Sequence, residues 1–276
     1  MAALSQDRQP WIALTIGNSC LHWFYYLGPQ LQQTWTTQHL SLSDSQLPSD
    51  TKWQQWSPAL GYHQSQGIEP LLPSLWVASV VPAQTQIWQN YPRIKILTGA
   101  DIPLHQPYMS FGLDRALAVW TAGSLYGWPV LVVDGGTALT FTGAVSAQEC
   151  LGGCIVPGLG LQLRSLSLST ANLPKVPAPE HLPPRWARDT TTAIQSGVLY
   201  ALTAGLAVGI GDWMQRYPHS QLVITGGEGQ RLKQYLQEWY KQQKQTPAWL
   251  DQLRLVPTLL AQGMQRLRQQ QAKMVE

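Results

Sequence analysis

A short apolar run, a glycine turn and a second apolar run occur twice in this chain. The first copy runs from Trp11 to Leu27 around Gly17-Asn18-Ser19, and the second runs from Val130 to Val145 around Gly135-Gly136-Thr137. Each copy predicts a β-hairpin, because β-prone segments are separated by residues that favour tight turns. The pattern that opens the chain therefore restarts near residue 130 with a second hairpin of the same kind.

Other segments extend both halves in an alternating α/β order. Additional short strands are expected at residues 33–39, 75–81, 94–97, 222–225 and 253–256. Helical spacing of apolar residues is found at 113–125, 191–214 and 232–240 and in a Gln-rich stretch from Thr258, and 41–73 carries two candidate helical stretches. Residues 173–188 hold five prolines and predict a long loop, of a kind that often faces substrate in compact enzymes.

Charge and composition exclude several classes of function. With 276 residues the chain is long enough for one large or two modest domains. Charged residues make up only 12%, and the small basic excess lies from Glu228 onward, where there are eight basic and four acidic residues. Nucleic-acid binding is therefore not expected, because it needs a basic face on the body of the protein.

Cysteine usage and hydropathy point to a cytoplasmic protein without a membrane anchor. Cys20, Cys150 and Cys154 form no C-x-x-C pair, and the six histidines show no metal-binding spacing, so a zinc site is unsupported. No apolar run reaches the ~18 residues that span a bilayer, and the 191–214 helix is polar and glycine-broken. The sequence thus predicts no membrane contact and a reducing compartment.

Three glycine turns follow predicted strands, at Gly17-Asn18-Ser19, Gly135-Gly136-Thr137 and Gly226-Gly227. Glycine lets backbone N–H groups approach a phosphate closely. Each turn alone is more often a simple tight turn, but three in one chain favour phosphate binding. Asp134 closes the strand before the second turn. It either holds a cation that neutralises phosphate charge or satisfies its own turn by a local hydrogen bond.

A G-x-D-R segment, Gly112-Leu113-Asp114-Arg115, opens the predicted helix at 113–125. The helix dipole favours an ionised carboxylate in the first turn, so Asp114 is a candidate to accept a proton. The alternative is a helix cap with a surface ion pair.

In order and spacing, these elements resemble the type III pantothenate kinases of the actin, hexokinase and acetate kinase superfamily, over nearly the whole chain. The matching landmarks are Ile16-Gly17-Asn18-Ser19 for D-x-G-N-T, Ser79-Val80-Val81-Pro82, the G-x-D-R segment, Asp134-Gly135-Gly136-Thr137 for D-x-G-T, residues 151–159 for L-G-G-x-I-x-P-G-L, and Ala193-Ile194-Gln195-Ser196-Gly197.

The resemblance implies an α/β fold of duplicated ribonuclease-H-like (actin-like ATPase) domains, with mixed sheets flanked by helices. We expect an N-terminal domain at 1–126 with the first phosphate turn and G-x-D-R, and a C-terminal domain at 127–276 with the D-G-G-T turn and the last helices, with ATP bound between them. The implied reaction is ATP-dependent phosphorylation of the pantothenate hydroxyl to 4'-phosphopantothenate, the first step of coenzyme A biosynthesis. The implied partners are Mg²⁺, a monovalent cation (K⁺ or NH₄⁺) and a second copy of the chain in a homodimer.

The resemblance also implies roles for individual residues. Asp114 is expected to be the catalytic base, and Asp134 the metal ligand. The implied ATP contacts are Thr15, Ile16, Gly17, Asn18, Ser19, Cys20, Leu21, His22 and Thr137. The implied pantothenate contacts are Tyr108, Gly112, Leu113, Asp114, Arg115 and Thr190.

Two positions depart from the family pattern. Thr15 stands where the family has an aspartate in its first turn, and threonine cannot supply that negative charge. The family's substrate tyrosine falls strictly on His105, with Tyr108 three residues later, and Tyr108 is the preferred contact. The Thr15 departure motivates one rival, a kinase-like regulatory or binding protein with reduced activity. Another rival is a different sugar or acid kinase of the superfamily.

Overall fold

The computed structural model describes residues 9–40 and 73–275, and it divides them into two compact units. The first unit holds the described residues up to Ile102, then Gly112–Asp114 and the segment from Leu260. The second unit comprises Pro103–Phe111 and Arg115–Leu259. The two helical stretches expected within 41–73 lie outside the described residues, apart from position 73.

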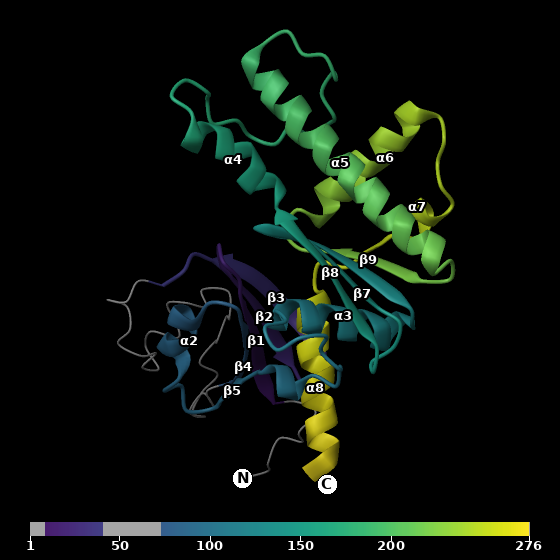
Figure 1. Cartoon of the computed structure of the whole chain (residues 1–276). Coiled ribbons are helices and arrows are strands. Elements are labelled where there is room, and N and C mark those ends of the chain that lie inside the picture. Colours follow the sequence, from purple (N-terminus) through teal and green to yellow (C-terminus); the bar gives the residue numbers. More distant parts are fainter. Residues whose placement is uncertain (1–8, 41–72, 276) are drawn as a thin grey trace. The chain divides into compact units, whose positions relative to one another are not determined.

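The first unit is built on a five-stranded sheet in the order β3-β2-β1-β4-β5. Its strands are β1 (Pro10–Ile16), β2 (Leu21–Leu27), β3 (Gln30–Thr37), β4 (Ser74–Ser79) and β5 (Ile94–Ile96). The opening meander β1-β2-β3 is antiparallel, whereas β4 pairs parallel with β1 and β5 pairs parallel with β4. The predicted hairpin and the three further short strands of this half are thus confirmed (Figure 1).

Helices cover the sheet of the first unit. The short helix α2 (Pro82–Trp88) buries Ile87 and Trp88 in one apolar cluster with β1, β2 and β4. The C-terminal helix α8 (Leu259–Val275) also belongs to this unit, and the Arg268 guanidinium lies 5.1 Å from the ring centre of Trp11 in β1. After β5, the short 3₁₀ helix η3 (Gly99–Asp101) is stabilised by an ion pair from Lys95 to Asp101.

The second unit repeats the same strand order. Its sheet runs β8-β7-β6-β9-β10, with an antiparallel meander β6-β7-β8 followed by parallel pairing of β9 to β6 and of β10 to β9. The strands are β6 (Val130–Gly135), β7 (Ala138–Ala144), β8 (Cys150–Pro157), β9 (Gln221–Thr225) and β10 (Arg254–Leu255). Two copies of one topology confirm the duplicated α/β fold with mixed sheets.

Five helices belong wholly or mainly to the second unit. They are α3 (Leu113–Tyr126), α4 (Leu159–Ser169), α5 (Thr190–Arg216), α6 (Gly229–Gln243) and α7 (Trp249–Gln252) (Figure 1). By length and composition α5 could cross a membrane, but half of its most apolar stretch is buried. Leu199, Leu202, Leu206 and Ile210 pack into the core of this unit, so α5 has the character of a core helix.

The expected domain boundary between residues 126 and 127 stays a prediction, and the compact units divide the chain differently. The helix α8 joins the first unit, although it follows the whole second sheet in the sequence. Most of α3 joins the second unit, with only Leu113 and Asp114 of this helix grouped with the first. Contacts between residues distant in sequence decide both assignments, and such contacts are not visible in a sequence.

Candidate active site

The first glycine turn connects β1 to β2 in the first unit. The Gly17 amide donates to the Cys20 carbonyl oxygen at 3.1 Å, while Asn18 and Ser19 at the tip are exposed. Thr15 lies one residue before Ile16 at the end of β1 and is buried, paired with His22 of β2 and Ala78 of β4. The turn therefore offers backbone and hydroxyl donors, with a neutral side chain at position 15.

Cys20 and His22 follow this turn, Cys20 directly before β2 and His22 within it. The Cys20 Sγ and His22 Nε2 atoms lie 3.3 Å apart, and His22 Nδ1 lies 2.9 Å from the Thr36 hydroxyl of β3. Burial raises the pKa of the Cys20 thiol and lowers the pKa of the His22 imidazole. Both shifts favour the neutral thiol and neutral imidazole, so this pair is not a thiolate nucleophile.

In the second unit, glycines distant in sequence pack onto one another at the end of β6. We call Gly135, Gly136, Gly158 and Gly226 the glycine cradle. The Gly158 amide donates to the Thr137 carbonyl at 2.9 Å, and a side chain at Gly158 would strike the backbone of Gly136 and Thr137. Gly226 has φ +83°, and a side chain there would strike the Asp134 carboxylate. The second and third predicted glycine turns are therefore neighbours.

The α6 N-terminus completes the cradle. The Glu228 amide donates to the Gly135 carbonyl oxygen at 2.8 Å, and a Cβ atom on Gly135 would lie 2.6 Å from Leu232 Cδ1. Asp134 is half-buried between its strand partners, Thr140 on β7 and Thr225 on β9. A helix N-terminus and one carboxylate beside closely packed glycine backbone suit a phosphate with its cation.

A second group in this unit surrounds Arg115, and we call it the arginine cluster: Arg115, Tyr108, Phe111, Phe141 and Thr142. Arg115 is 5% exposed. It donates from Nε to the Thr142 hydroxyl at 3.0 Å, from Nη1 to the Tyr108 hydroxyl at 3.1 Å, and from Nη2 to the Phe141 carbonyl at 3.3 Å. It also lies 4.8 Å from the Phe111 ring centre. The helix-cap reading of Arg115 with a surface ion pair does not fit this burial.

The glycine-rich strand β8 packs against the same group. A Cβ atom on Gly152, whose φ is +84°, would lie 3.8 Å from Pro107 and 4.0 Å from the Tyr108 ring. A side chain on Gly153 would strike the Phe141 backbone. The L-G-G-x-I-x-P-G-L segment thus reaches both groups, with Gly152 at the arginine cluster and Gly158 in the glycine cradle.

The remaining predicted residues are placed as follows. Asp114 precedes Arg115 in the first turn of α3 and is half-buried, whereas His105 is exposed and donates its backbone amide to the Ala147 carbonyl at 2.8 Å. Thr190 is the exposed first residue of α5, where the Asp189 carboxylate caps the helix by accepting from the Thr192 amide at 2.9 Å. Those capping bonds lower the pKa of Asp189.

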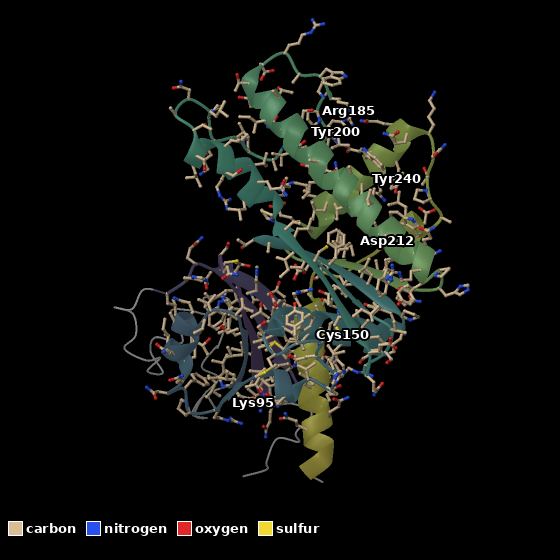
Figure 2. All side chains as sticks on the ribbon, viewed as in Figure 1. Lys95, Cys150, Arg185, Tyr200, Asp212 and Tyr240 are labelled. Carbon is tan, nitrogen blue, oxygen red and sulfur yellow. The ribbon has the colours of Figure 1, made fainter. Side chains whose placement is uncertain are left out.

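The Pro-rich loop at 173–188 is confirmed as irregular, and its carbonyl groups are bonded to the helices beneath it. Ser196 donates to the Arg185 carbonyl at 2.8 Å, and Gln234 donates to the Glu180 carbonyl at 2.8 Å. The Arg185 guanidinium stacks 4.2 Å from the Tyr200 ring centre, and Figure 2 shows the two together at α5. The loop is therefore anchored on α5 and α6.

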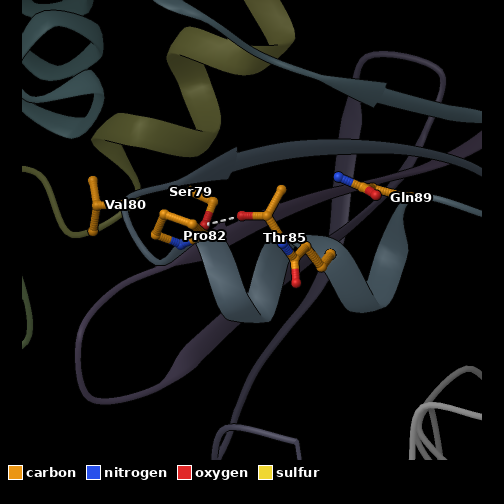
Figure 3. Close-up of a pocket in the computed structure, with 6 residues that line it drawn as sticks. Ser79, Val80, Pro82, Thr85 and Gln89 are labelled. Atoms are coloured by element: carbon orange, nitrogen blue, oxygen red, sulfur yellow. Dashed lines mark hydrogen bonds between the residues drawn. The ribbon is translucent and has the colours of Figure 1, made fainter. Parts of the chain in front are cut away.

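A shallow depression of about 350 Å³ lies beside the Ser79-Val80-Val81-Pro82 landmark in the first unit. The Thr85 hydroxyl donates to Ser79 Oγ at 2.7 Å across its wall (Figure 3). The residues that line it are Ser79, Val80, Pro82, Thr85, Gln86 and Gln89. None of these six is a predicted site residue, and none has an ionisable side chain. We assign no role to it.

Sequence reasoning did not identify Phe141, Thr142 and Gly158 as individual site residues. Phe141 and Thr142 lie in the middle of β7 and belong to no motif, so no sequence signal points to them. Gly158 lies within the L-G-G-x-I-x-P-G-L landmark. Its place directly before helix α4, as the N-cap residue, is the signal that could have identified it.

Comparison with known proteins agrees with these features. The sequence profile of the family described as type III pantothenate kinase matches residues 11–210. A type III pantothenate kinase of Nostoc sp. is 42% identical over 266 residues, which cover 93% of this chain and 94% of that protein.

Solved structures share the fold at low sequence identity. A Campylobacter jejuni protein described as a Baf family transcriptional activator has a TM-score of 0.60 at 17% identity, covering 95% of this chain and 99% of that one. A Sinorhizobium meliloti protein described as a 2-dehydro-3-deoxygalactonokinase has a TM-score of 0.54 at 12% identity, covering 94% and 96%. With the profile and the Nostoc relative, the landmarks lead to one conclusion: the chain belongs to the type III pantothenate kinase family.

Proposed function

We propose that this pantothenate kinase transfers the γ-phosphoryl group of ATP to the terminal hydroxyl of pantothenate, giving 4'-phosphopantothenate for coenzyme A biosynthesis. The arginine cluster is the observation that carries the proposal. A buried guanidinium holds the Tyr108 hydroxyl, and the Asp114 carboxylate precedes Arg115 on α3. A cation, a phenol and a carboxylate together suit an alcohol substrate that also bears a carboxylate.

Asp114 is the proposed general base on the pantothenate hydroxyl. Its place in the first turn of α3 favours the ionised form, because the positive end of the helix dipole lies there. Phosphoryl transfer needs positioning and charge neutralisation more than covalent chemistry. We assign the positioning of pantothenate to Tyr108, Gly112, Leu113, Arg115 and Thr190.

We assign ATP to the turn at residues 15–22 and to Thr137, with Asp134 as metal ligand. Within the described residues no group of three His, Cys, Asp or Glu side chains could hold a metal ion by itself. Mg²⁺ is commonly held by one or two carboxylates with water and substrate phosphates, and Asp134 at the glycine cradle fits that mode. A bound cation, divalent or monovalent (K⁺ or NH₄⁺), neutralises phosphate charge.

We also propose a cytoplasmic homodimer. An exposed stripe of small and apolar residues runs along α5, spaced at one helical turn: Ala193, Gly197, Ala201, Gly205 and Val208. Nothing lies within 4 Å of a Cβ atom built on Gly197 or Gly205. A flat apolar stripe on a long helix suits close packing against a second copy of itself.

The rival candidate is a kinase-like binding or regulatory protein, favoured by Thr15. A buried threonine there leaves the first turn without the carboxylate of the family pattern. Turnover separates the two candidates, because a binding protein could keep every glycine turn.

The deciding experiment measures pantothenate phosphorylation with ATP and Mg²⁺, with and without K⁺, in the wild type and in Asp114→Asn. We expect K⁺-stimulated turnover that falls by about 10²- to 10⁴-fold in kcat in the variant. Asp251→Asn, at an exposed position on α7, is the matched control and should leave turnover unchanged. A folded wild type that turns over no pantothenate would exclude the proposed function.

A further inference from the structure

A histidine that no motif covers holds the first glycine turn. His39 lies two residues beyond the end of β3, and its Nε2 atom is 2.8 Å from the Gly17 carbonyl oxygen. A carbonyl oxygen can only accept, so Nε2 carries the proton and donates. The Gly17 amide already donates to Cys20 at 3.1 Å, and the His39 bond therefore engages the second polar group of this glycine.

The His39 bond controls the direction of the next amide in the turn. The Gly17 carbonyl and the Asn18 N–H belong to one planar trans peptide, and they point in opposite directions. Fixing the carbonyl toward His39 consequently fixes the Asn18 N–H on the other side of the plane. A hydrogen bond accepted at the carbonyl also polarises the amide and makes its N–H a better donor.

The chain at His39 is itself held by a buried side chain. The Gln84 amide group of α2 accepts from the Leu40 backbone N–H at 3.0 Å and donates to the Leu40 carbonyl at 2.9 Å. Gln84 is 9% exposed and Leu40 is half-buried, so these two bonds are partly shielded from solvent. The residue after His39 is thus tied to α2, across 44 positions of sequence.

The turn is fixed on its other side by β4 and the residue that follows. The Val80 amide donates to the Ile16 carbonyl at 3.1 Å, one peptide before the group that His39 holds. Successive carbonyls, of Ile16 and Gly17, are therefore bonded by different segments of the first unit. The exposed tip at Asn18 and Ser19 stands on a backbone that is fixed before any ligand arrives.

We propose that His39 is a positioning residue for the nucleotide: it orients the peptide between Gly17 and Asn18 so that the Asn18 amide is set to donate to an ATP phosphate. The inference rests on the proposed function, in which this turn binds ATP. Preorganised backbone donors lower the entropic cost of ordering the turn on binding. The loss of His39 should therefore weaken the binding of ATP and leave the binding of pantothenate unchanged.

The test compares two substitutions of similar reach at position 39. His39→Gln keeps an N–H donor at the end of the side chain, whereas His39→Met removes it. The measurements are kcat, KM for ATP, KM for pantothenate, the thermal midpoint, and the calorimetric Kd for a non-hydrolysable ATP analogue with Mg²⁺. Gln38→Ala, at the exposed neighbouring position, is the control.

We expect His39→Met to raise KM for ATP and Kd for the analogue by about five- to tenfold, the effect of one hydrogen bond, with KM for pantothenate unchanged. His39→Gln and Gln38→Ala should resemble the wild type. The proposal is overturned if the methionine variant binds the analogue normally, if both His39 variants lose affinity equally, or if KM for pantothenate rises in parallel. A wild type that binds the analogue but phosphorylates no pantothenate defeats the proposed function alone, because the binding comparison still tests His39.

Discussion

Arg115 donates a hydrogen bond from Nη1 to the Tyr108 hydroxyl over 3.1 Å, although Arg115 is 5% exposed and Tyr108 is 46% exposed. The guanidinium thus holds a side chain whose ring remains open to solvent. Thr142 and Phe141 of β7 fix the other guanidinium nitrogens, so the position of the Tyr108 hydroxyl is set from within the second unit.

Tyr108→Phe tests whether that hydroxyl contacts pantothenate. The ring and its contact with Phe111 remain, and only the group bonded to Arg115 is lost. We expect KM for pantothenate to rise by about five- to tenfold, with KM for ATP unchanged, in steady-state kinetics. Tyr217→Phe, packed on Trp213 in the same unit, controls for loss of a phenol elsewhere. Unchanged KM for pantothenate in Tyr108→Phe would remove Tyr108 from the substrate contacts.

Gly158→Ala tests the packing of the glycine cradle. A Cβ atom there would lie 2.7 Å from the Thr137 carbonyl oxygen and would strike Gly136, so the turn after β6 must shift. We expect the free energy of unfolding to fall by about 1–3 kcal/mol, which lowers the thermal midpoint, and we expect KM for ATP to rise. Gly211→Ala is the control, because nothing lies within 4 Å of its Cβ position. That helical substitution should be neutral or slightly stabilising.

The attachment of the Pro-rich loop to α6 should weaken as the pH rises. The hydrogen bond to Glu238, 2.7 Å long, raises the pKa of His181. Burial alone would raise the pKa of Glu238, but bonds from His181, the Leu182 amide and Gln234 outweigh it and lower that pKa. The pKa of His181 is raised in the folded state. The stabilisation that His181 gives to the loop attachment is therefore complete below the unfolded value near 6.5, and it is lost as pH rises through the folded pKa.

The pKa shift of Glu238 has the opposite sign, so the stabilisation that Glu238 contributes is lost as pH falls through its lowered pKa. The two shifts together favour attachment of the loop at mildly acid pH. Limited proteolysis at 173–188 should therefore be slower near pH 6 than near pH 8. His181→Gln should remove this pH dependence. A cleavage rate in the wild type that stays constant over this range, after correction for protease activity, would contradict the prediction.

Val208→Glu tests the proposed homodimer. Val208 is 71% exposed on the α5 stripe, and a carboxylate in an apolar interface would lose its hydration without a partner. We expect the variant to sediment as a monomer at concentrations where the wild type sediments as a dimer. Gln270→Glu, at an exposed position on α8, adds the same charge away from the stripe and should leave the dimer intact. A monomeric wild type would end the dimer proposal.

Local patterns predicted most strands and the long helices, because each has its own periodicity or turn signal. The prediction did not include α4, whose leucines at 159, 161, 163, 166 and 168 alternate in part like a strand. In the helix, Leu159 and Leu163 are buried and Leu168 is 76% exposed. Strand β8 was not predicted as a strand either, because glycine has a low strand propensity. In the structure, Gly152 and Gly153 of this strand have positive φ.

The motif residues of the candidate site could be named from the sequence, but the contacts among them could not. Gly152 beside Tyr108, and Gly158 against Gly136, are pairings set by how β8 and α4 pack in three dimensions. His39 illustrates the same limit, since a single histidine after a strand carries no signal until its carbonyl partner is known.

The last helix has a consequence for the order in which the chain is made. Helix α8 buries Ala261, Met264 and Leu267, and its Gln265 amide donates to the Pro29 carbonyl of the first unit at 2.6 Å. A ribosome releases the strands of the first unit before the second sheet, and α8 only after that sheet. During synthesis, the first unit must therefore keep one apolar surface uncovered until α8 has emerged, by which time the sheet and helices of the second unit are complete.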